Sequence, residues 1–165
     1  MALDNKDTDF VKFWNLVLEP KFTKYRHILQ GGLSRHSAAV IPRLPIGEGM
    51  SVLDVGCGWG DMSLQVAAIV GPKGRVVGID CVEVFLDEAR KDAAALGLSN
   101  VEFSRGDAEV ALPENEFDYV IARFGTMFFT NPVAALRRMR LALKPGGHMT
   151  HIVWRRREDN PAWQK

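Results

Sequence analysis

Short apolar runs alternate with amphipathic stretches over the last two-thirds of the chain. The runs are bounded by Gly, Pro or charged residues and predict five strands, at 51–55, 75–80, 101–104, 117–122 and 148–154. Apolar residues recur at helical spacing within 61–70, 83–96 and 132–143. Strands that alternate with helices predict a mostly parallel sheet, covered on both faces by right-handed crossovers. We therefore expect a doubly wound α/β fold with strand order 3-2-1-4-5.

The first 46 residues show helical periodicity without strands. After a polar start that we expect to be frayed, the pattern predicts a helix over 10–19 that ends at Pro20, and a second over 21–29 that stops at Gly31-Gly32. Ser34 is suited to cap a third helix, which reaches Ile41. Two interpretations stay open for this segment: an amphipathic cover with one wet face, or a lid over a ligand cleft. The expected organisation is a helical cover at 1–46 and an α/β domain at 47–165.

Bulk properties exclude several classes of protein. The 165 residues suit one core, and a formal net charge of +1 gives no global electrostatic case for a nucleic-acid or membrane surface. The polar, acidic N-terminus is unlike a signal peptide, and no apolar run approaches the roughly 20 residues of a membrane span. Cys57 and Cys81 stand alone, without the spacing of a metal site or a disulfide framework. We therefore expect two reduced thiols, no bound metal and a cytoplasmic protein.

The ends of the predicted strands carry the candidate chemistry. The first strand contains Asp54 and leads into a glycine-rich turn made by Gly56, Gly58 and Gly60. Asp80, Asp107 and Arg123 follow the second, third and fourth strands. Because the carboxyl ends of parallel strands meet along one edge of a sheet, a single extended ligand could touch all of them. Glycines let a ligand lie against bare backbone, near the unpaired N–H groups of the next helix.

These residue types favour a cationic nucleoside. The Asp80 carboxylate can accept hydrogen bonds from both hydroxyls of a ribose. Asp107 can accept one from an exocyclic adenine amine, while the Ala108 amide faces a ring nitrogen and Val82, next to Cys81, offers the base an apolar surface. Asp54 is placed to meet a positively charged amino group. The glycine spacing is GxGxG rather than GxGxxG, and no Walker lysine follows, so a pyrophosphate is disfavoured.

Five segments carry a family resemblance: VLDVGCGWGD, VVGID, GDAE, FDYVIARFG and LKPGG. They resemble the successive motifs of class I S-adenosylmethionine-dependent methyltransferases, which have a Rossmann-like fold, and most of all the bacterial small-molecule group related to the quinone C-methyltransferases. The resemblance covers about residues 51–154. It implies that the three glycines lie under the methionine part of S-adenosylmethionine, with Asp54 near its amino group, Asp80 on the ribose, and Asp107 and Ala108 on the adenine. It also places Arg123 close to the methionine and the transferable methyl.

Two features depart from the family. The chain stops soon after the fifth predicted strand, whereas family members continue with a helix and an antiparallel strand pair. The fifth strand is therefore expected to be an unpaired, association-prone edge, in a partial form of a longer protein or in one that needs a partner such as a second copy. Arg123 stands where many relatives carry a small polar residue, so the contacts of the fourth strand cannot be transferred directly.

The expected function is methyl transfer from S-adenosylmethionine to a small molecule. If residues 126–129 form a substrate wall, the acceptor would be apolar or aromatic; otherwise they are plain core. None of the histidines stands out as a general base, and the arginine runs at 137–140 and 155–157 are interpreted as solvated faces rather than nucleic-acid contacts. Two alternatives stay open. One is an NAD-dependent dehydrogenase, because Asp80 also suits an NAD ribose. The other is a non-catalytic cofactor-binding module that lacks its substrate half.

Overall fold

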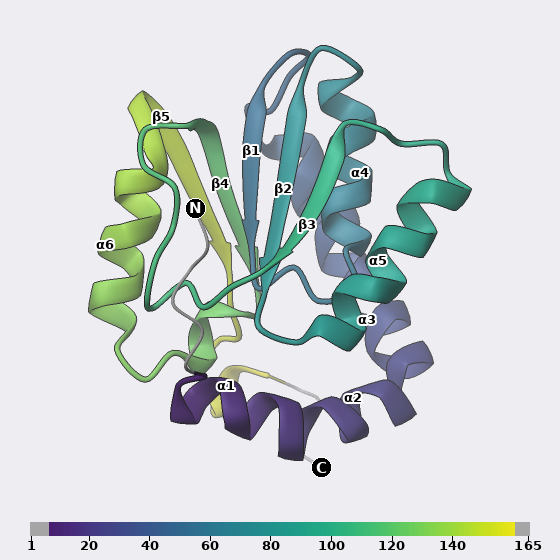
Figure 1. Ribbon diagram of the computed structural model, residues 1–165, viewed down its shortest axis with the longest axis vertical. Coiled ribbons are helices and arrows are strands. Elements are labelled where there is room, and N and C mark those ends of the chain that lie inside the picture. The colour runs from purple at the N-terminus through teal and green to yellow at the C-terminus, as the bar shows by residue number, and fades with distance from the viewer. Residues whose placement is uncertain (1–6, 161–165) are drawn as a thin grey trace.

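The computed structural model describes residues 7–160, which form a central parallel sheet with helices on both faces (Figure 1). Its strands are β1 (Ser51–Val55), β2 (Arg75–Asp80), β3 (Val101–Arg105), β4 (Phe117–Arg123) and β5 (Leu143–Ile152). They lie in the order β3-β2-β1-β4-β5, and every pair is parallel. The predicted doubly wound fold and strand order are confirmed. The order reverses between β1 and β4, which places the cleft of such a sheet at their carboxyl ends.

The three central strands, β1, β2 and β4, are buried on both faces, as their nearly continuous apolar runs indicate. On one face Val52, Val76 and Tyr119 pack with α4 (Asp61–Val70), beside which α5 (Glu83–Ala95) lies. On the other face Leu53 and Val77 pack with α6 (Pro132–Ala142). Successive side chains of a strand point to opposite faces, so neighbouring residues of β1 and β2 belong to two separate cores. This arrangement holds the β1–α4 turn rigidly between two packed layers.

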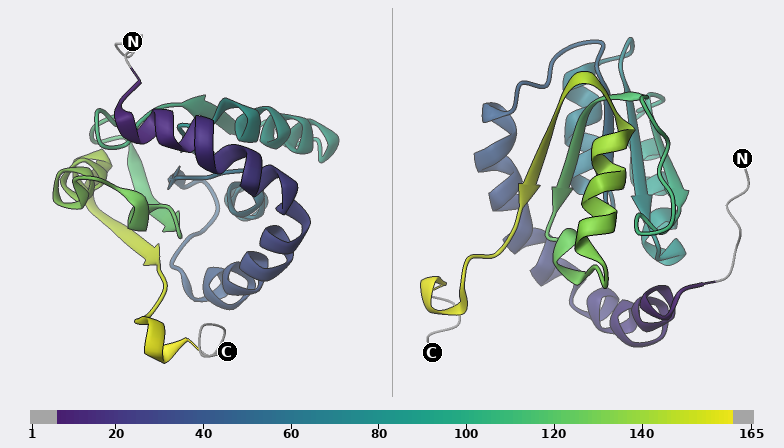
Figure 2. Two further views of the ribbon diagram at one scale, coloured as in Figure 1. Left: turned by 90° about the horizontal axis from the view of Figure 1, so that it is seen from below. Right: turned by 90° about the vertical axis from the view of Figure 1, so that its left-hand side faces the viewer.

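The N-terminal helices differ from the prediction. The elements α1 (Asp9–Phe13), η1 (Trp14–Leu18) and α2 (Glu19–Lys24) form one continuous rod, and η1 is a π-helical turn. The expectation that Pro20 ends the first helix was wrong. Pro20 lies in the first turn of α2, where a missing N–H costs little. The rod crosses the carboxyl end of the sheet (Figure 2, left).

The next helix, α3 (Arg26–Val40), runs straight through Gly31-Gly32 and is followed by η2 (Ile41–Arg43). The predicted stop at these glycines and the predicted cap at Ser34 were both wrong. Ser34 instead donates a hydrogen bond back to the Gly31 carbonyl, 3.2 Å away. Buried Ser37 and Ile41 anchor the end of the helix, so tertiary contacts override the low helix propensity of glycine. The chain changes direction at Tyr25 instead.

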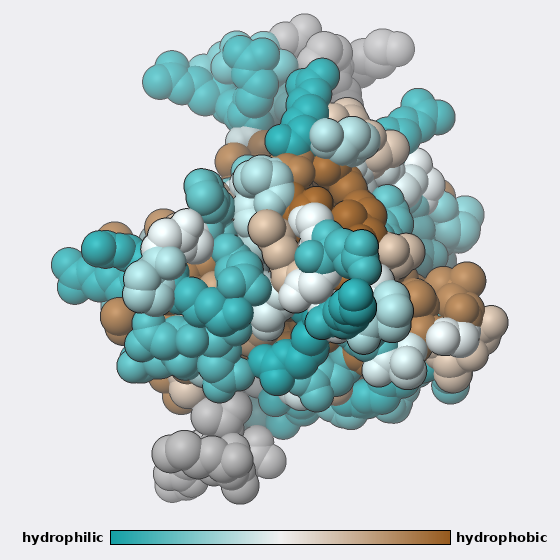
Figure 3. All heavy atoms as spheres, turned by 90° about the horizontal axis from the view of Figure 1, so that it is seen from above, coloured by the Kyte–Doolittle hydropathy of each residue, from teal (hydrophilic) through white to brown (hydrophobic). Residues whose placement is uncertain are grey.

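Two short helices complete the described part of the chain: η3 (Thr126–Phe128) after β4, and η4 (Arg157–Asp159) near the last described residue. Among the described strands β5 lies at the edge of the sheet, as expected. At the end where the strands begin, hydrophilic side chains dominate the surface, with hydrophobic ones in a central patch and along one flank (Figure 3). No helix among residues 7–160 is long and apolar enough to cross a bilayer. Of the polar residues 1–9, which we expected to be frayed, 1–6 lie outside the described part, as do the last five residues of the chain. The expectation was wrong for Thr8 and Asp9, because Thr8 caps α1 and Asp9 is its first residue.

Candidate functional site

The turn between β1 and α4 is built from three glycines that all have positive φ. The values are 71° at Gly56, 55° at Gly58 and 75° at Gly60, in the region that residues with a Cβ rarely adopt. The Ile79 carbonyl accepts hydrogen bonds from the N–H groups of Gly56 and Cys57, which ties the turn to β2. An added Cβ at Gly58 would meet nothing within 4 Å, whereas one at Gly56 would lie 3.1 Å from the Gly125 backbone. The turn therefore presents bare backbone at Gly58.

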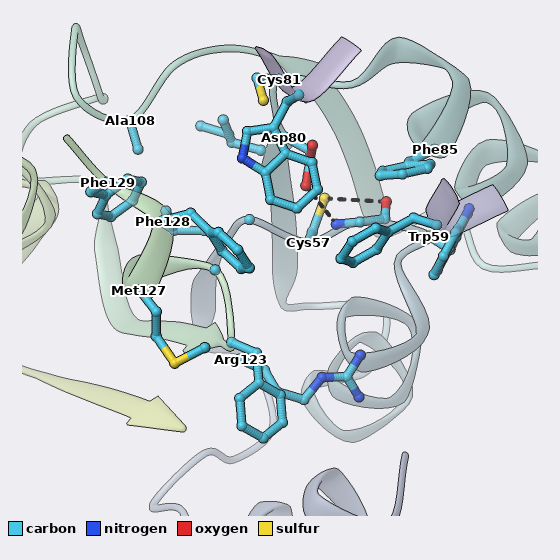
Figure 4. A pocket seen from close by; sticks show the side chains of 18 of the residues that line it. Cys57, Trp59, Asp80, Cys81, Phe85, Ala108, Arg123, Met127, Phe128 and Phe129 are labelled. Atoms are coloured by element: carbon cyan, nitrogen blue, oxygen red, sulfur yellow. Dashed lines mark hydrogen bonds between the residues drawn. The ribbon is translucent and has the colours of Figure 1, made fainter. Parts of the chain in front are cut away.

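A cavity of about 200 Å³ lies over this turn, between the carboxyl ends of the strands and the N-terminal rod (Figure 4). At about 10–15 Å³ per water it has room for roughly 13 to 20 water molecules, so it is large enough for a ligand. Seven of the ten predicted site residues line it: Gly56, Gly58, Asp80, Cys81, Asp107, Ala108 and Arg123. The other three, Asp54, Gly60 and Val82, do not.

Two backbone hydrogen bonds hold the Asp80 side chain beside the glycine turn. Its two carboxylate oxygens accept hydrogen bonds from the Gly58 N–H at 2.9 Å and the Val82 N–H at 3.0 Å. Burial raises the pKa of Asp80, and these backbone hydrogen bonds oppose that rise. A carboxylate has about four lone-pair positions, so two remain for a ligand. The side chain therefore both holds the turn and keeps acceptor capacity toward the cavity.

Asp107 is held by the chain on both sides. Oδ1 accepts the Glu109 N–H at 2.8 Å, and Oδ2 accepts the hydroxyl of Thr8, also at 2.8 Å. Thr8 caps α1, so the N-terminal rod is tied to a predicted adenine-binding residue. A second tie joins the Asn15 amide to the Cys81 carbonyl at 3.1 Å. These contacts give the cover the position of a lid, although no sequence signal located Thr8 or Asn15.

Asp54 lies beneath the turn rather than in the cavity. Its side chain is buried and accepts a hydrogen bond of 2.6 Å from Ser63, which is also buried. Burial raises the pKa of Asp54 to about 6, although the Ser63 hydrogen bond and the charge of Arg123 both lower it. The carboxylate is thus kept in the ionised form at neutral pH against a cost of desolvation.

Gly60 and Val82 are packed against other parts of the protein rather than against the cavity. A Cβ on Gly60 would lie 2.7 Å from the Phe103 ring and 2.8 Å from Ala89, so only glycine lets α4, α5 and β3 approach this closely. Val82 is completely buried, is the N-cap of α5, and packs in the cluster beneath the N-terminal rod. Their predicted contacts with a cofactor remain predictions.

Arg123 makes an ion pair that sequence reasoning missed. Its guanidinium donates two hydrogen bonds to the Asp61 carboxylate, both 2.7 Å long, and a third to the Ser37 hydroxyl at 2.6 Å. The Arg123 side chain is 10% exposed and that of Asp61 21%, so the pair is largely shielded from water. Asp61 also lines the cavity. The sequence did offer a signal for Asp61, because it is an acidic residue that directly follows the glycine turn and lies in the first turn of α4, near the ends of the strands.

The electrostatics of the site favour a cationic ligand. Asp54, Asp61, Asp80 and Asp107 stand at or under the cavity, against the single guanidinium of Arg123. The carboxylates act on one another: Asp61 and Asp80 both raise the pKa of Asp54. Burial, together with nearby Asp80, raises the pKa of the thiols of Cys57 and Cys81, so both are held as neutral thiols. Within residues 7–160 no group of three or more acidic, His or Cys side chains is arranged to hold a metal ion.

Aromatic side chains form the remaining walls. The N-terminal rod contributes Phe10, Trp14 and Phe22, and the segment after β4 contributes Phe128 and Phe129. Phe10 lies 6.2 Å from Phe129 and Trp14 5.0 Å from Phe128 between ring centroids, so the two segments meet over the cavity. The segment at 126–129 therefore borders the cavity through its last three residues. None of the four histidines lines it; His36 packs edge-on against Phe124 and Trp154.

Comparison with known proteins agrees with this geometry. A family model described as a methyltransferase domain matches residues 46–163, so the chain belongs to this family. The demethylmenaquinone methyltransferase of Listeria monocytogenes serotype 4a is 41% identical over 106 residues, which are 64% of this chain and 45% of that protein. The predicted relation to class I S-adenosylmethionine-dependent methyltransferases of the quinone group is confirmed. The chain spans less than half the length of this curated relative.

Two solved structures extend the comparison. An S-adenosylmethionine-dependent methyltransferase from Aquifex aeolicus has a TM-score of 0.69 and 30% identity, over 76% of this chain and 66% of the other. The cyclase SpnF has a TM-score of 0.64 and 34% identity, over 71% of this chain and 43% of the other. The same fold therefore occurs in a protein described by a different reaction, so the acceptor must be argued from the site.

Proposed function

We propose that this chain binds S-adenosylmethionine across the carboxyl ends of β1, β2 and β3 and transfers its methyl group to a small apolar or aromatic acceptor. The observation that carries this proposal is that Asp80 and Asp107 both line one cavity that is also lined by the bare glycine backbone of the β1–α4 turn. The site residues and the division into a cover at 1–46 and an α/β domain at 47–165 form part of the proposal.

The residues present fit the nucleoside half of the cofactor. Asp80 keeps two lone-pair positions for the ribose hydroxyls, at hydrogen bonds worth about 1.5–3 kcal/mol each when one partner is charged. Asp107 and the Ala108 amide would hold the adenine, and Cys81 borders the same part of the cavity. The open space above Gly58 leaves room for the cofactor to lie on the backbone. Thr8 shares Oδ2 of Asp107, so the cover closes directly over the adenine position.

The methionine half would meet the charged groups around Arg123. This end of the ligand carries an ammonium and a carboxylate, and the pair formed by Arg123 and Asp61 offers the complementary charges at the cavity wall. Buried Asp54 adds negative potential from below. The site carries more acidic than basic groups, which stabilises the positive sulfonium as well.

Bound S-adenosylmethionine supplies an electrophilic methyl group for in-line displacement. The chain's own residues contribute by positioning, which is worth about 7–11 kcal/mol for well-oriented partners. The rod and the segment after β4 exclude water from the cavity, and Phe10, Trp14, Phe128 and Phe129 offer flat apolar faces to the acceptor. Since no histidine lines the cavity, an acceptor that loses its proton readily in water suits the site best.

The acceptor class follows from these walls. Aromatic rings stack on flat ligands with offset or edge-to-face geometry, and the cavity is bordered by such rings on two sides. The curated relatives are named for demethylmenaquinone. We extend to this chain only the class of acceptor, a flat, largely apolar ring system.

Calorimetric titration with S-adenosylhomocysteine tests the cofactor assignment. Asp80→Ala should weaken binding at least tenfold, about 1.4 kcal/mol, because it removes the ribose acceptor. Asp80→Asn keeps one oxygen that can accept a hydrogen bond from the turn, so it shows whether affinity is lost with the charge or with the structure of the turn. Asp87→Ala removes an exposed carboxylate of α5 and is the matched control. Unchanged affinity in folded Asp80→Ala, or tight binding of NAD in place of the homocysteine compound, would contradict the proposal.

The second candidate function is a non-catalytic module that binds the cofactor. Incubation with radiolabelled S-adenosylmethionine and a lipid and metabolite extract distinguishes the two. A labelled product above a boiled control supports catalysis. Cofactor binding without any labelled product supports a binding module.

A further inference from the structure

Exposed apolar side chains gather on the outer side of the N-terminal rod and the start of α3. They are Phe13, Leu16, Val17, Tyr25 and Ile28. Leu16 is 77% exposed and Ile28 60%, values that are high for residues of this kind. The inner side of the same rod lines the cavity through Phe10, Trp14 and Phe22. The rod is therefore apolar on both sides, and in Figure 1 it lies at the bottom of the molecule, below the sheet and α4 to α6.

A second segment at the same end has similar character. Val153 and Trp154 are exposed, and Trp154 also lines the cavity. Three arginines, Arg155, Arg156 and Arg157, follow directly and are exposed. In Figures 1 and 2 this segment and the rod lie at the same end of the molecule. We call residues 8–28 and 153–160 together the cavity-end face.

The charge of the cavity-end face differs from that of the rest of the chain. Its two segments contain seven Lys and Arg against four Asp and Glu, whereas the other residues contain fourteen against sixteen. Lys12, Lys21 and Lys24 project from the rod as exposed side chains. The overall charge of +1 hides this separation, because two opposite local charges nearly cancel. Apolar side chains flanked by basic ones are the pattern of an element that lies in the interface of an anionic bilayer.

We propose that the cavity-end face docks on the surface of an anionic lipid bilayer. Leu16, Phe13 and Ile28 enter the boundary between headgroups and acyl chains, while Lys21, Lys24 and the arginines contact anionic headgroups. The rod that covers the cavity then rests on the bilayer, and Trp154, which lines the cavity, lies at the same surface. An apolar acceptor dissolved in the membrane therefore has only the cover to pass before it reaches the aromatic walls. This last step rests on the proposed function, whereas docking itself does not.

Flotation of the whole chain with vesicles tests docking. We expect it to float with vesicles of phosphatidylcholine and phosphatidylglycerol, less with phosphatidylcholine alone, and less as salt is raised. Leu16→Ser with Ile28→Ser should weaken vesicle binding at least tenfold. Leu96→Ser is the matched control, because Leu96 is 64% exposed at the far end of α5 and should leave binding unchanged. Lys21→Gln should weaken binding to the anionic vesicles, and Lys73→Gln, in the turn before β2, should not.

Several outcomes overturn the proposal. One is a chain that stays in solution with both kinds of vesicle, and another is equal loss of binding in Leu96→Ser. A third is sedimentation showing a dimer that Leu16→Ser dissociates, which would assign the face to a second copy. Circular dichroism and titration with S-adenosylhomocysteine in solution show whether each variant is folded. Vesicle binding without binding of that compound would refute the proposed function and leave docking intact.

Discussion

Replacing Asp54 with Asn should stabilise the folded chain at neutral pH and weaken its affinity for a cationic ligand. The side chain is 1% exposed, and burial raises its pKa to about 6 from an ordinary value of 3.8. The folded state therefore binds this proton more tightly than the unfolded state. The contribution of Asp54 to stability is most favourable below about pH 4 and is lost as the pH rises to about 6.

The magnitude follows from these values. The interval from 3.8 to about 6, at 1.36 kcal/mol per pH unit, corresponds to about 3 kcal/mol. Asparagine keeps an oxygen that accepts the hydrogen bond from Ser63, but its NH₂ group then needs a partner, at a cost of about 1–3 kcal/mol if none is found. The absolute gain at pH 7 is therefore smaller than 3 kcal/mol. The cost of an unpartnered NH₂ group does not depend on pH, so it cancels when the difference in stability between the two proteins is compared at two pH values.

Urea unfolding of both proteins from pH 4 to 7.5 measures this change. The free energy of unfolding of Asp54→Asn, relative to that of the parent chain, should rise by about 2.4 kcal/mol over this range, because a small part of the full 3 kcal/mol is already lost at pH 4. Subtracting the parent removes most of the contribution of Asp80, whose pKa is also raised, mainly by burial. If Asp54 supports an ammonium group, S-adenosylhomocysteine should bind the variant at least tenfold more weakly, and the parent should lose affinity below pH 6.

Asp118 provides the control of opposite sign. Hydrogen bonds from the Ser51 N–H and from Lys144 lower its pKa, so its contribution to stability is present above about pH 4 and is lost as the pH falls further. Asp118→Asn should therefore destabilise the chain at pH 7, whereas Asp54→Asn should not. A difference between Asp54→Asn and the parent that stays flat from pH 4 to 7.5 would refute the buried, raised-pKa carboxylate.

Three further predictions concern the turn, the ion pair and the cover. Gly60→Ala should lower the free energy of unfolding in urea by more than about 2 kcal/mol, because the new Cβ meets the Phe103 ring. Gly58 has a similar φ but open space around it, so Gly58→Ala should cost only the roughly 1–2 kcal/mol of the strained backbone; equal costs would contradict the packing role of Gly60. Arg123→Met should destabilise by about 3–5 kcal/mol because Asp61 is left unpaired, and adding Asp61→Leu should recover most of this loss; no recovery in the double variant would argue against the pair. Thr8→Val should reduce hydrogen-exchange protection of α1 while leaving β1 unchanged, and protection that stays the same would show that the bond to Asp107 does not hold the cover.

The sequence indicated most of the sheet because its signals are local. Apolar runs of strand length and glycine breaks located all five strands to within a few residues, except that β5 begins at Leu143 and passes through Pro145 and two glycines. Parallel pairing with β4 and an irregular register near Phe117 accommodate these residues. The helices of the cover were placed less well. Gly31-Gly32 and Pro20 act as breaks in an isolated chain, but packing of the surrounding apolar residues decided the helix ends here.

By itself, the sequence determined the order of the strands, the glycine turn and the acids at the strand ends, since each depends on neighbouring residues and on the fixed handedness of crossovers. Only the tertiary structure decided which acid faces the cavity. The Asp54 side chain points toward Ser63 of α4 instead of the cavity, because successive side chains of a strand alternate between the two faces of the sheet. It also decided that Asp61 pairs with Arg123, that Thr8 reaches Asp107, and that apolar and basic residues far apart in the chain share one face. Such contacts depend on distances in space between residues up to 99 positions apart, which no local pattern encodes.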